Sequence, residues 1–101
     1  MMFEKRTKVN GVIVRLVPYT EKRRSLLDQV NNDIREYAAK HSDMSWETMP
    51  LDKKAEFWKA KADILWEPET PLDLNFFKSE EFEYTILKDT EDFFFMTRLY
   101  L

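Results

Sequence analysis

Carboxylates are the side chains with the clearest chemical potential in this sequence of 101 residues, which contains 19 Asp and Glu. Paired carboxylates can act as general acid and base or can hold a metal ion. Here the neighbouring acidic residues mostly lie one or two positions apart, so their side chains would point in different directions on a helix. We therefore expect solvated surface and no catalytic site. The two clusters are Glu80, Glu81 and Glu83, and then Asp89, Glu91 and Asp92.

Other residues that could carry out catalysis or bind a ligand are few. With no cysteine and one histidine, His41, the sequence lacks most nucleophile–base pairs and the common zinc sites. His41 ends a predicted helix, where it can hydrogen-bond the last carbonyl groups. Gly11, the single glycine, is needed in a turn, which excludes a glycine-rich phosphate loop. We expect a protein that is not an enzyme and has no catalytic residues, no metal site and no cofactor.

The composition is typical of one domain that spans residues 1–101. Apolar residues make up 44% of the chain and aromatic residues 15%, which argues against disorder. The lack of cysteine fits a reducing compartment. The first residues have no apolar segment of the signal-peptide type, and no apolar run approaches the roughly 18 residues of a membrane span. We therefore expect a cytoplasmic protein with no membrane partner.

Basic residues gather in the N-terminal half of the chain. They could form a phosphate-binding patch, but no aromatic residues interleave with them and the whole chain carries a net charge of −3. We therefore expect a solvated face and no nucleic-acid partner. The residues are Arg6, Lys8, Arg15 and Lys22 to Arg24.

A β-hairpin over residues 3–17 is the first element that must position any site. Asn10-Gly11 stands between two runs of strand-forming residues, a pattern that predicts a type I′ turn. A two-residue loop then pairs Val9 with Val12, Thr7 with Val14 and Lys5 with Leu16, and it places Phe3 near Pro18. Because an isolated two-stranded ribbon is only marginally stable, its apolar face must lie on the rest of the chain.

Apolar periodicity predicts two helices, over about residues 20–41 and 50–66. Thr20 is a suitable N-cap, Pro50 suits a first turn, and Pro68 and Pro71 end the second helix. The second helix carries two apolar lines, so it is either central to the domain or shared with another chain. In so small a protein the central position is favoured. The longer line, expected in the core, comprises Leu51, Ala55, Trp58, Ala62 and Leu65; the shorter comprises Phe57 and Ile64.

The C-terminal segment, about residues 72–100, is compatible with two structures. After a short helical turn from Pro71 to Phe77, Ser79 could cap a helix. Its apolar stripe would comprise Phe82, Ile86, Phe93, Met96 and Tyr100, with Leu87, Phe94 and Leu101 beside it at heptad spacing. Alternatively, Phe82, Tyr84 and Ile86 alternate with polar residues as a strand of a second hairpin. The expected fold class is α+β: an N-terminal β-hairpin followed by a mainly helical bundle of three helices, with a second hairpin as the alternative for this segment.

Aromatic residues exceed what one small core can hide, since 12 of the 15 lie at or beyond Trp46. Any remainder would be exposed apolar surface, which in a soluble protein indicates partner binding or self-association. We expect a protein partner and self-association. The candidate contact residues are Phe57 and Ile64 on the shorter helical line, and Phe93, Phe94 and Phe95 in the C-terminal run.

The N-terminal pattern resembles that of tail assembly chaperones of long-tailed, lambda-like phages. The similarity covers roughly residues 1–71: Phe3, Asn10-Gly11-Val12, Val14, Leu16 and Thr20 before an amphipathic helix, then Trp66-Glu67-Pro68 and Pro71 after a second helix. The Phe93–Leu101 ending has no counterpart. Members of this family are mainly helical, which favours the helical form of the C-terminal segment.

The resemblance implies a non-enzymatic chaperone in the cytoplasm of the bacterial host. It would bind and solubilise the long helical tape measure protein and help to recruit tail tube subunits, and such genes often also yield a longer, frameshifted form. The alternative is a small acidic phage inhibitor, or nucleic-acid mimic, that blocks a host protein. The carboxylates of the second half of the chain favour this alternative, whereas the aromatic residues among them do not.

Overall fold

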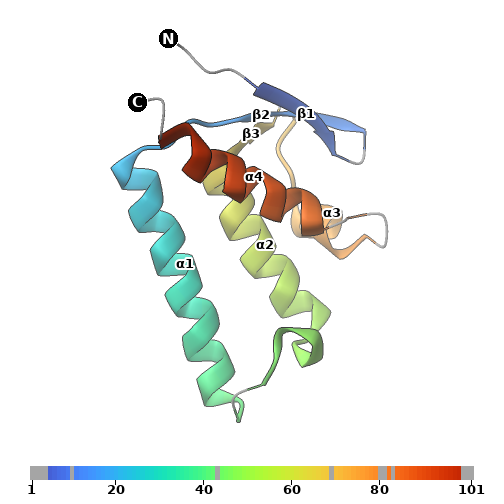
Figure 1. Cartoon of the computed structure of the whole chain (residues 1–101). Coiled ribbons are helices and arrows are strands. Elements are labelled where there is room, and N and C mark those ends of the chain that lie inside the picture. Colours follow the sequence, from blue (N-terminus) through green and yellow to red (C-terminus); the bar gives the residue numbers. More distant parts are fainter. Residues whose placement is uncertain are drawn as a thin grey trace.

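The computed structural model describes residues 5–9, 11–42, 44–68, 70–79, 82 and 84–98. It confirms the α+β fold, with an antiparallel hairpin followed by helices (Figure 1). A small sheet lies at one end, and α1 and α2 extend side by side away from it. The elements are β1 (Lys5–Val9), β2 (Val12–Leu16), α1 (Glu21–Lys40), the 3-10 turn η1 (Trp46–Thr48), α2 (Leu51–Leu65), β3 (Trp66–Pro68), α3 (Leu74–Lys78) and α4 (Tyr84–Thr97).

The hairpin has the register predicted from Asn10-Gly11. Val9 pairs with Val12, Thr7 with Val14 and Lys5 with Leu16. Gly11 has φ of +82°, as one of the two central residues of a type I′ turn requires. Asn10 and Phe3 lie outside the described residues, as do Glu80, Glu81, Glu83, Leu99, Tyr100 and Leu101.

A third strand, β3, was not predicted. The segment Trp66–Pro68 pairs antiparallel with β2, so that Leu16 lies opposite Trp66 and Val14 opposite Pro68, in the sheet order β1-β2-β3. A proline is tolerated there because β3 is an edge strand, whose outer side needs no ladder hydrogen bonds. Arg15 on β2 also forms an ion pair with Glu67 on β3. What the proline pattern indicated as the end of a helix is therefore also the third strand of the sheet.

Both long helices begin as their sequences predict. The Thr20 hydroxyl accepts a hydrogen bond from the Arg23 N–H at 3.1 Å, which caps α1. The Pro50 carbonyl accepts hydrogen bonds from the Lys53 and Lys54 N–H groups at the start of α2. At the sheet end, the Arg23 side chain donates to the Ile64 carbonyl at 2.7 Å and thereby joins α1 to the end of α2.

The C-terminal segment is helical, and the alternative of a second hairpin is wrong. The Asp73 side chain caps α3 by accepting from the Phe76 N–H at 3.1 Å. Ser79 ends α3 and does not cap α4, because α4 begins only at Tyr84. The buried face of α4 is centred on the predicted adjacent line and not on the main stripe: Met96 of the stripe is exposed, whereas Leu87 and Phe94 are buried. The buried residues recur at a helical spacing of three and four, at Leu87, Thr90, Phe94 and Thr97.

Helix α2 is the centre of the domain, as the interpretation favoured for a small protein required. It packs against α1, α3 and α4, and β3 continues directly from its end. Two buried threonines of α4 hold that helix to the sheet end. The Trp66 indole N–H donates to the Thr90 hydroxyl at 3.1 Å, and the Tyr19 backbone N–H donates to the Thr97 hydroxyl at 2.9 Å. Among the described residues, no helix is both long and apolar enough to cross a membrane.

Candidate functional site

The residues predicted to contact a partner are mostly buried within the chain itself. Phe57, Ile64 and Phe94 expose 9%, 8% and 0% of their surface, and Phe93 and Phe95 are half-buried against the core. Phe57 and Ile64 are therefore core residues of this chain, and their contact with another chain stays a prediction. Helix α1 contacts both positions: the Tyr37 ring lies edge-on to the Phe57 ring at 6.1 Å, and the Arg23 side chain donates to the Ile64 backbone carbonyl. The shorter apolar line of α2 therefore belongs to the core, because helices pack on α2 from more than one direction.

The line that was predicted to be buried is not uniformly so. Ala55, Ala62 and Leu65 are buried, but Leu51 is exposed in the first turn of α2 and Trp58 is only half-buried. Trp58 instead forms part of the wall of a surface pocket. A large aromatic side chain that stays partly open to solvent is the first indication of a binding surface.

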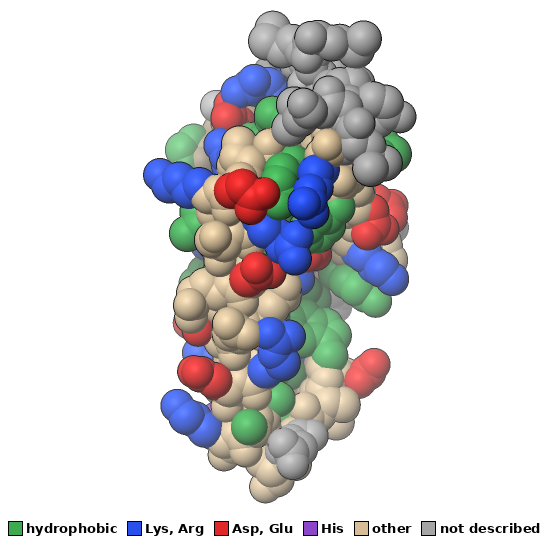
Figure 2. Space-filling view, turned by 60° about the vertical axis from the view of Figure 1, so that its left-hand side comes forward, with side chains coloured by type: hydrophobic (Ala, Val, Ile, Leu, Met, Phe, Trp, Pro, Cys, Tyr) green, Lys and Arg blue, Asp and Glu red, His purple; other side chains and the backbone are tan. Residues whose placement is uncertain are grey.

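This pocket, which we call the aromatic pocket, has a volume of about 270 Å³ and lies between α1, α2, α4 and η1. Helix α1 and the 3-10 turn contribute one lining residue each, α2 contributes two and α4 contributes four. Figure 2 shows hydrophobic side chains gathered beside α1, between charged side chains of both signs. The lining residues are Ile34, Trp46, Trp58, Lys61, Tyr84, Leu87, Lys88 and Glu91.

Ring contacts fix the aromatic wall of the pocket. Trp58 is stacked with Tyr84, with 6.2 Å between ring centroids and 9° between ring planes, and its ring lies 5.8 Å from that of Trp46. It also contacts the buried Phe82 ring at 5.3 Å, and Phe82 in turn meets Phe77 at 5.1 Å. The wall is thus continuous with the core. Such contacts hold the rings in place before any partner arrives, which reduces the ordering cost of binding.

Some of the lysine side chains around the pocket form an ion pair with a carboxylate, and others do not. The Lys61 ammonium pairs with the Glu91 carboxylate at 3.2 Å, and both side chains are less than one-fifth exposed. The Lys54 ammonium lies 5.9 Å from the centre of the Trp46 ring, and Lys88 is an exposed lining residue. In the described part of the chain, neither Lys54 nor Lys88 forms an ion pair with a carboxylate.

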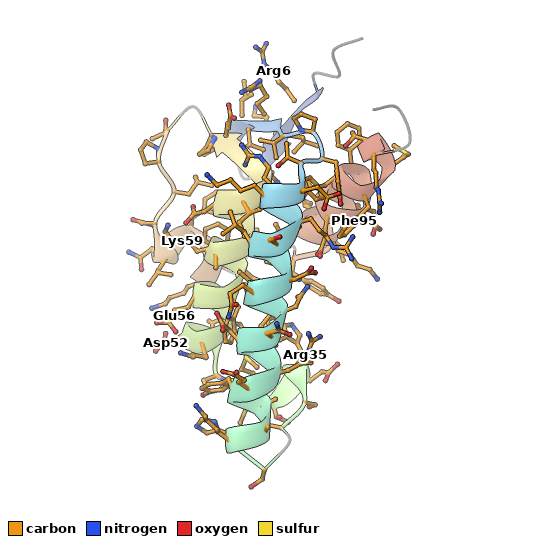
Figure 3. The ribbon with its side chains drawn as sticks, turned by 90° about the vertical axis from the view of Figure 1, so that its left-hand side faces the viewer. Arg6, Arg35, Asp52, Glu56, Lys59 and Phe95 are labelled. Atoms are coloured by element: carbon orange, nitrogen blue, oxygen red, sulfur yellow. The ribbon has the colours of Figure 1, made fainter. Side chains whose placement is uncertain are left out.

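The side of α2 away from the pocket is different in character. Figure 3 shows Asp52, Glu56 and Lys59 on one side of α2, while Arg35 and Phe95 lie on the opposite side of the molecule. Those three charged residues are each paired: Asp52 with Lys78, Glu56 with Lys53, and Lys59 with Asp63. This outer side is therefore a solvated face whose charged groups lie in exposed ion pairs, which contribute little to stability.

The basic group of the N-terminal half does not form one open patch. Arg15 and Arg23 both approach Glu67 of β3, and Arg24 forms an ion pair with Asp28 at 3.3 Å. The hydrogen bond from Arg24 to Asp28 also raises the pKa of Arg24, which is protonated at neutral pH in any case. His41 hydrogen-bonds the Tyr37 carbonyl through Nδ1 at 2.8 Å, which is the helix-terminal role expected of it.

The aromatic pocket is suited to binding. It has a mainly apolar wall, a few polar groups at its edge and an open side, features typical of recognition sites. In the described part of the chain, no three His, Asp or Glu side chains come together in a group that could hold a metal ion. Comparisons of the sequence with protein-family models and with curated proteins, and of the fold with solved structures, give no match.

Proposed function

We propose that this protein is a non-enzymatic tail assembly chaperone of a long-tailed phage, which binds and solubilises the tape measure protein and helps to recruit tail tube subunits. The observation that supports this proposal best is the aromatic pocket between α1, α2 and α4, an apolar surface on a domain whose other described faces carry many ion pairs. Apolar patches of this kind on soluble proteins mark sites of protein interaction.

The shape of the site favours a helical partner. Helices α1 and α2 have 20 and 15 residues, so they extend about 30 Å and about 22 Å from the sheet end. Figure 1 shows that α4 lies across α2 near the sheet. Ile34 of α1 and Trp58 of α2 line the pocket together with residues of α4. A partner helix laid there would pack on α1 and α2 as a further member of the bundle. An amphipathic helix in an apolar groove is a common mode of recognition.

The alternative, an acidic inhibitor that mimics nucleic acid, receives less support from the geometry. Such a mimic needs a surface of unpaired carboxylates. Of the 13 carboxylates among the described residues, six instead lie next to a Lys or Arg partner, in the pairs Arg15–Glu67, Arg24–Asp28, Lys53–Glu56, Lys59–Asp63, Lys61–Glu91 and Lys78–Asp52. These pairs give the surface a mixed charge and leave the apolar pocket as its distinctive feature.

Co-expression with the tape measure protein of the same phage genome tests this proposal. The tape measure protein should be insoluble alone and soluble with this chaperone, and the two should co-purify. Replacing Ile34 and Tyr84 by Ser should abolish co-purification, because both line the pocket and neither is fully buried. The matched control is Leu26→Ser with Met96→Ser, two exposed apolar residues outside the pocket. Equal loss in both double variants, or no loss in either, would contradict a role for the pocket.

A further inference from the structure

We infer that the helix bound by the aromatic pocket is acidic: its apolar anchor side chains are flanked by Asp or Glu. The inference rests on the proposed function, because it takes the pocket as the binding site, and it adds the chemistry of the partner. The pocket supplies two matched features, an apolar wall and unpaired ammonium groups on two of the elements that surround it.

The apolar part of the site selects the anchors. Ile34 on α1 and Trp58 on α2 lie on different walls, and Tyr84, which is 49% exposed, lies at the edge. The volume of about 270 Å³ accommodates one or two large aliphatic or aromatic side chains, not a whole helix. The partner therefore places a few anchors inward and keeps the rest of its surface at the edge of the pocket, as helices do with residues at i, i+3, i+4 and i+7.

The charged part of the site selects what flanks the anchors. Glu91 is the one carboxylate among the described lining residues, and it is already paired with Lys61. Lys88 on α4 and Lys54 on α2, beside Trp46, have no such partner in the described part of the chain. A helix with carboxylates near its anchors would pair with these ammonium groups as it displaces water from the apolar wall. A basic helix would bring like charges together, which opposes binding.

Nucleic acid is the other ligand that aromatic rings and lysines can attract, but the ring arrangement disfavours it. Base stacking needs an open ring face. The Tyr84 ring lies nearly parallel to Trp58 with 6.2 Å between centroids, and the Trp46 and Phe82 rings lie 5.8 Å and 5.3 Å from Trp58, so three rings crowd the space around it. The exposed parts of these rings can contact compact aliphatic side chains more readily than a flat base.

Designed peptides test this inference directly. Three fluorescein-labelled amphipathic peptides of about 18 residues, long enough to form a helix, share one apolar face. In the first peptide Glu residues flank the apolar anchors, and in the second Lys residues flank them. The third has the Glu residues of the first, but its anchors are replaced by Ser. Fluorescence anisotropy at low salt should show binding of the Glu-flanked peptide about tenfold tighter than that of the Lys-flanked peptide. Replacing the anchors by Ser should remove binding.

Charge reversal supplies the specific control. Lys54→Glu with Lys88→Glu should invert the preference, so that the Lys-flanked peptide binds more tightly. Lys8→Glu with Lys22→Glu changes the net charge equally at exposed sites away from the pocket and should leave the preference unchanged. If both control and test variants shift equally, the effect is one of net charge and the inference is wrong.

The remaining outcomes separate this inference from the proposed function. If both peptides bind equally and Ile34→Ser with Tyr84→Ser removes binding, the pocket binds helices but does not select acidic ones, and only the inference fails. If binding survives the Ile34 and Tyr84 replacements, the pocket is not the site and both fail. If light scattering shows a dimer of this chain that forms through the pocket, the inference of an acidic partner helix is also wrong.

Discussion

Phe57 and Trp58 are neighbours in the sequence, yet they lie on two sides of α2 with opposite characters. Phe57 faces α1, and 9% of its surface is exposed. The Tyr37 ring of α1 and the Lys53 ammonium of α2 lie over it. Trp58 faces η1 and α4 and remains half-buried in the wall of the aromatic pocket. We call these the Phe57 side and the Trp58 side of α2.

The hollows above these two sides differ in the same way. The hollow over Phe57 is lined by charged side chains of α1 and α2, among them Asp33, Glu36 and Lys53. The pocket at Trp58 is lined largely by rings and aliphatic groups. Water solvates the charged lining of the hollow over Phe57 favourably. Release of water from the apolar wall of the pocket at Trp58 lowers the free energy. The Phe57 side therefore serves stability, and the Trp58 side is the one available for binding.

The largest expected effect comes from truncating the Phe57 side. Phe57→Ala with Ile64→Ala removes two buried side chains, at a cost of about 3–5 kcal/mol for Phe and about 2–5 kcal/mol for Ile. The sum is similar to the whole stability of a small domain, so circular dichroism should find the variant largely unfolded at room temperature. A cooperative thermal melt close to that of the unmodified protein would show that α1 does not cover this side.

A hydrogen bond beneath the Trp58 side should give an intermediate effect. Thr90→Val leaves the indole N–H of the buried Trp66 without its acceptor, which should cost about 1–3 kcal/mol in urea unfolding. Thr85→Val, at an exposed position of the same helix, is the matched control and should change the free energy of unfolding by less than about 0.5 kcal/mol. Similar losses in both variants would point to α4 helix propensity instead of this hydrogen bond.

The smallest effect on stability is expected within the pocket. Tyr84→Ala removes a half-exposed ring stacked on Trp58, and such a ring pair contributes about 0.5–1.5 kcal/mol. Urea unfolding should therefore show a loss of about 1 kcal/mol, while affinity for the Glu-flanked peptide should fall clearly. A loss as large as that of Phe57→Ala alone would mean that the Trp58 side is ordinary core.

Local signals were sufficient to predict much of the fold. Asn10-Gly11 specifies the hairpin register because a two-residue turn leaves no freedom in the pairing, and the Thr20 cap marks the start of α1. The strand at Trp66–Pro68 has no comparable local signal, since a three-residue segment containing proline becomes a strand only where a partner, here β2, lies beside it. For the same reason, the choice of helix for residues 84–97 depends on tertiary contacts of Leu87 and Phe94.

The candidate site was harder to predict because it lies between elements. The two apolar lines of α2 were visible in the sequence, but a helical wheel does not show which neighbour covers which line. Because Trp58 belongs to the longer apolar line, it was predicted to be buried, and Phe57 on the shorter line was predicted to be exposed. In the structure α1 covers Phe57, and Trp58 lies partly open beside α4. Ile34 and Trp46 join the pocket from separate elements. Their one advance signal was the surplus of large apolar side chains.

The three indole N–H groups provide the most direct test of where a partner binds. Trp46 and Trp58 line the pocket, whereas Trp66 is 2% exposed and hydrogen-bonded to Thr90 in the interior. In an NMR titration with the Glu-flanked peptide, the indole resonances of Trp46 and Trp58 should shift and that of Trp66 should stay in place. A saturable titration in which Trp46 and Trp58 do not shift would contradict the assignment of the Trp58 side as the binding surface.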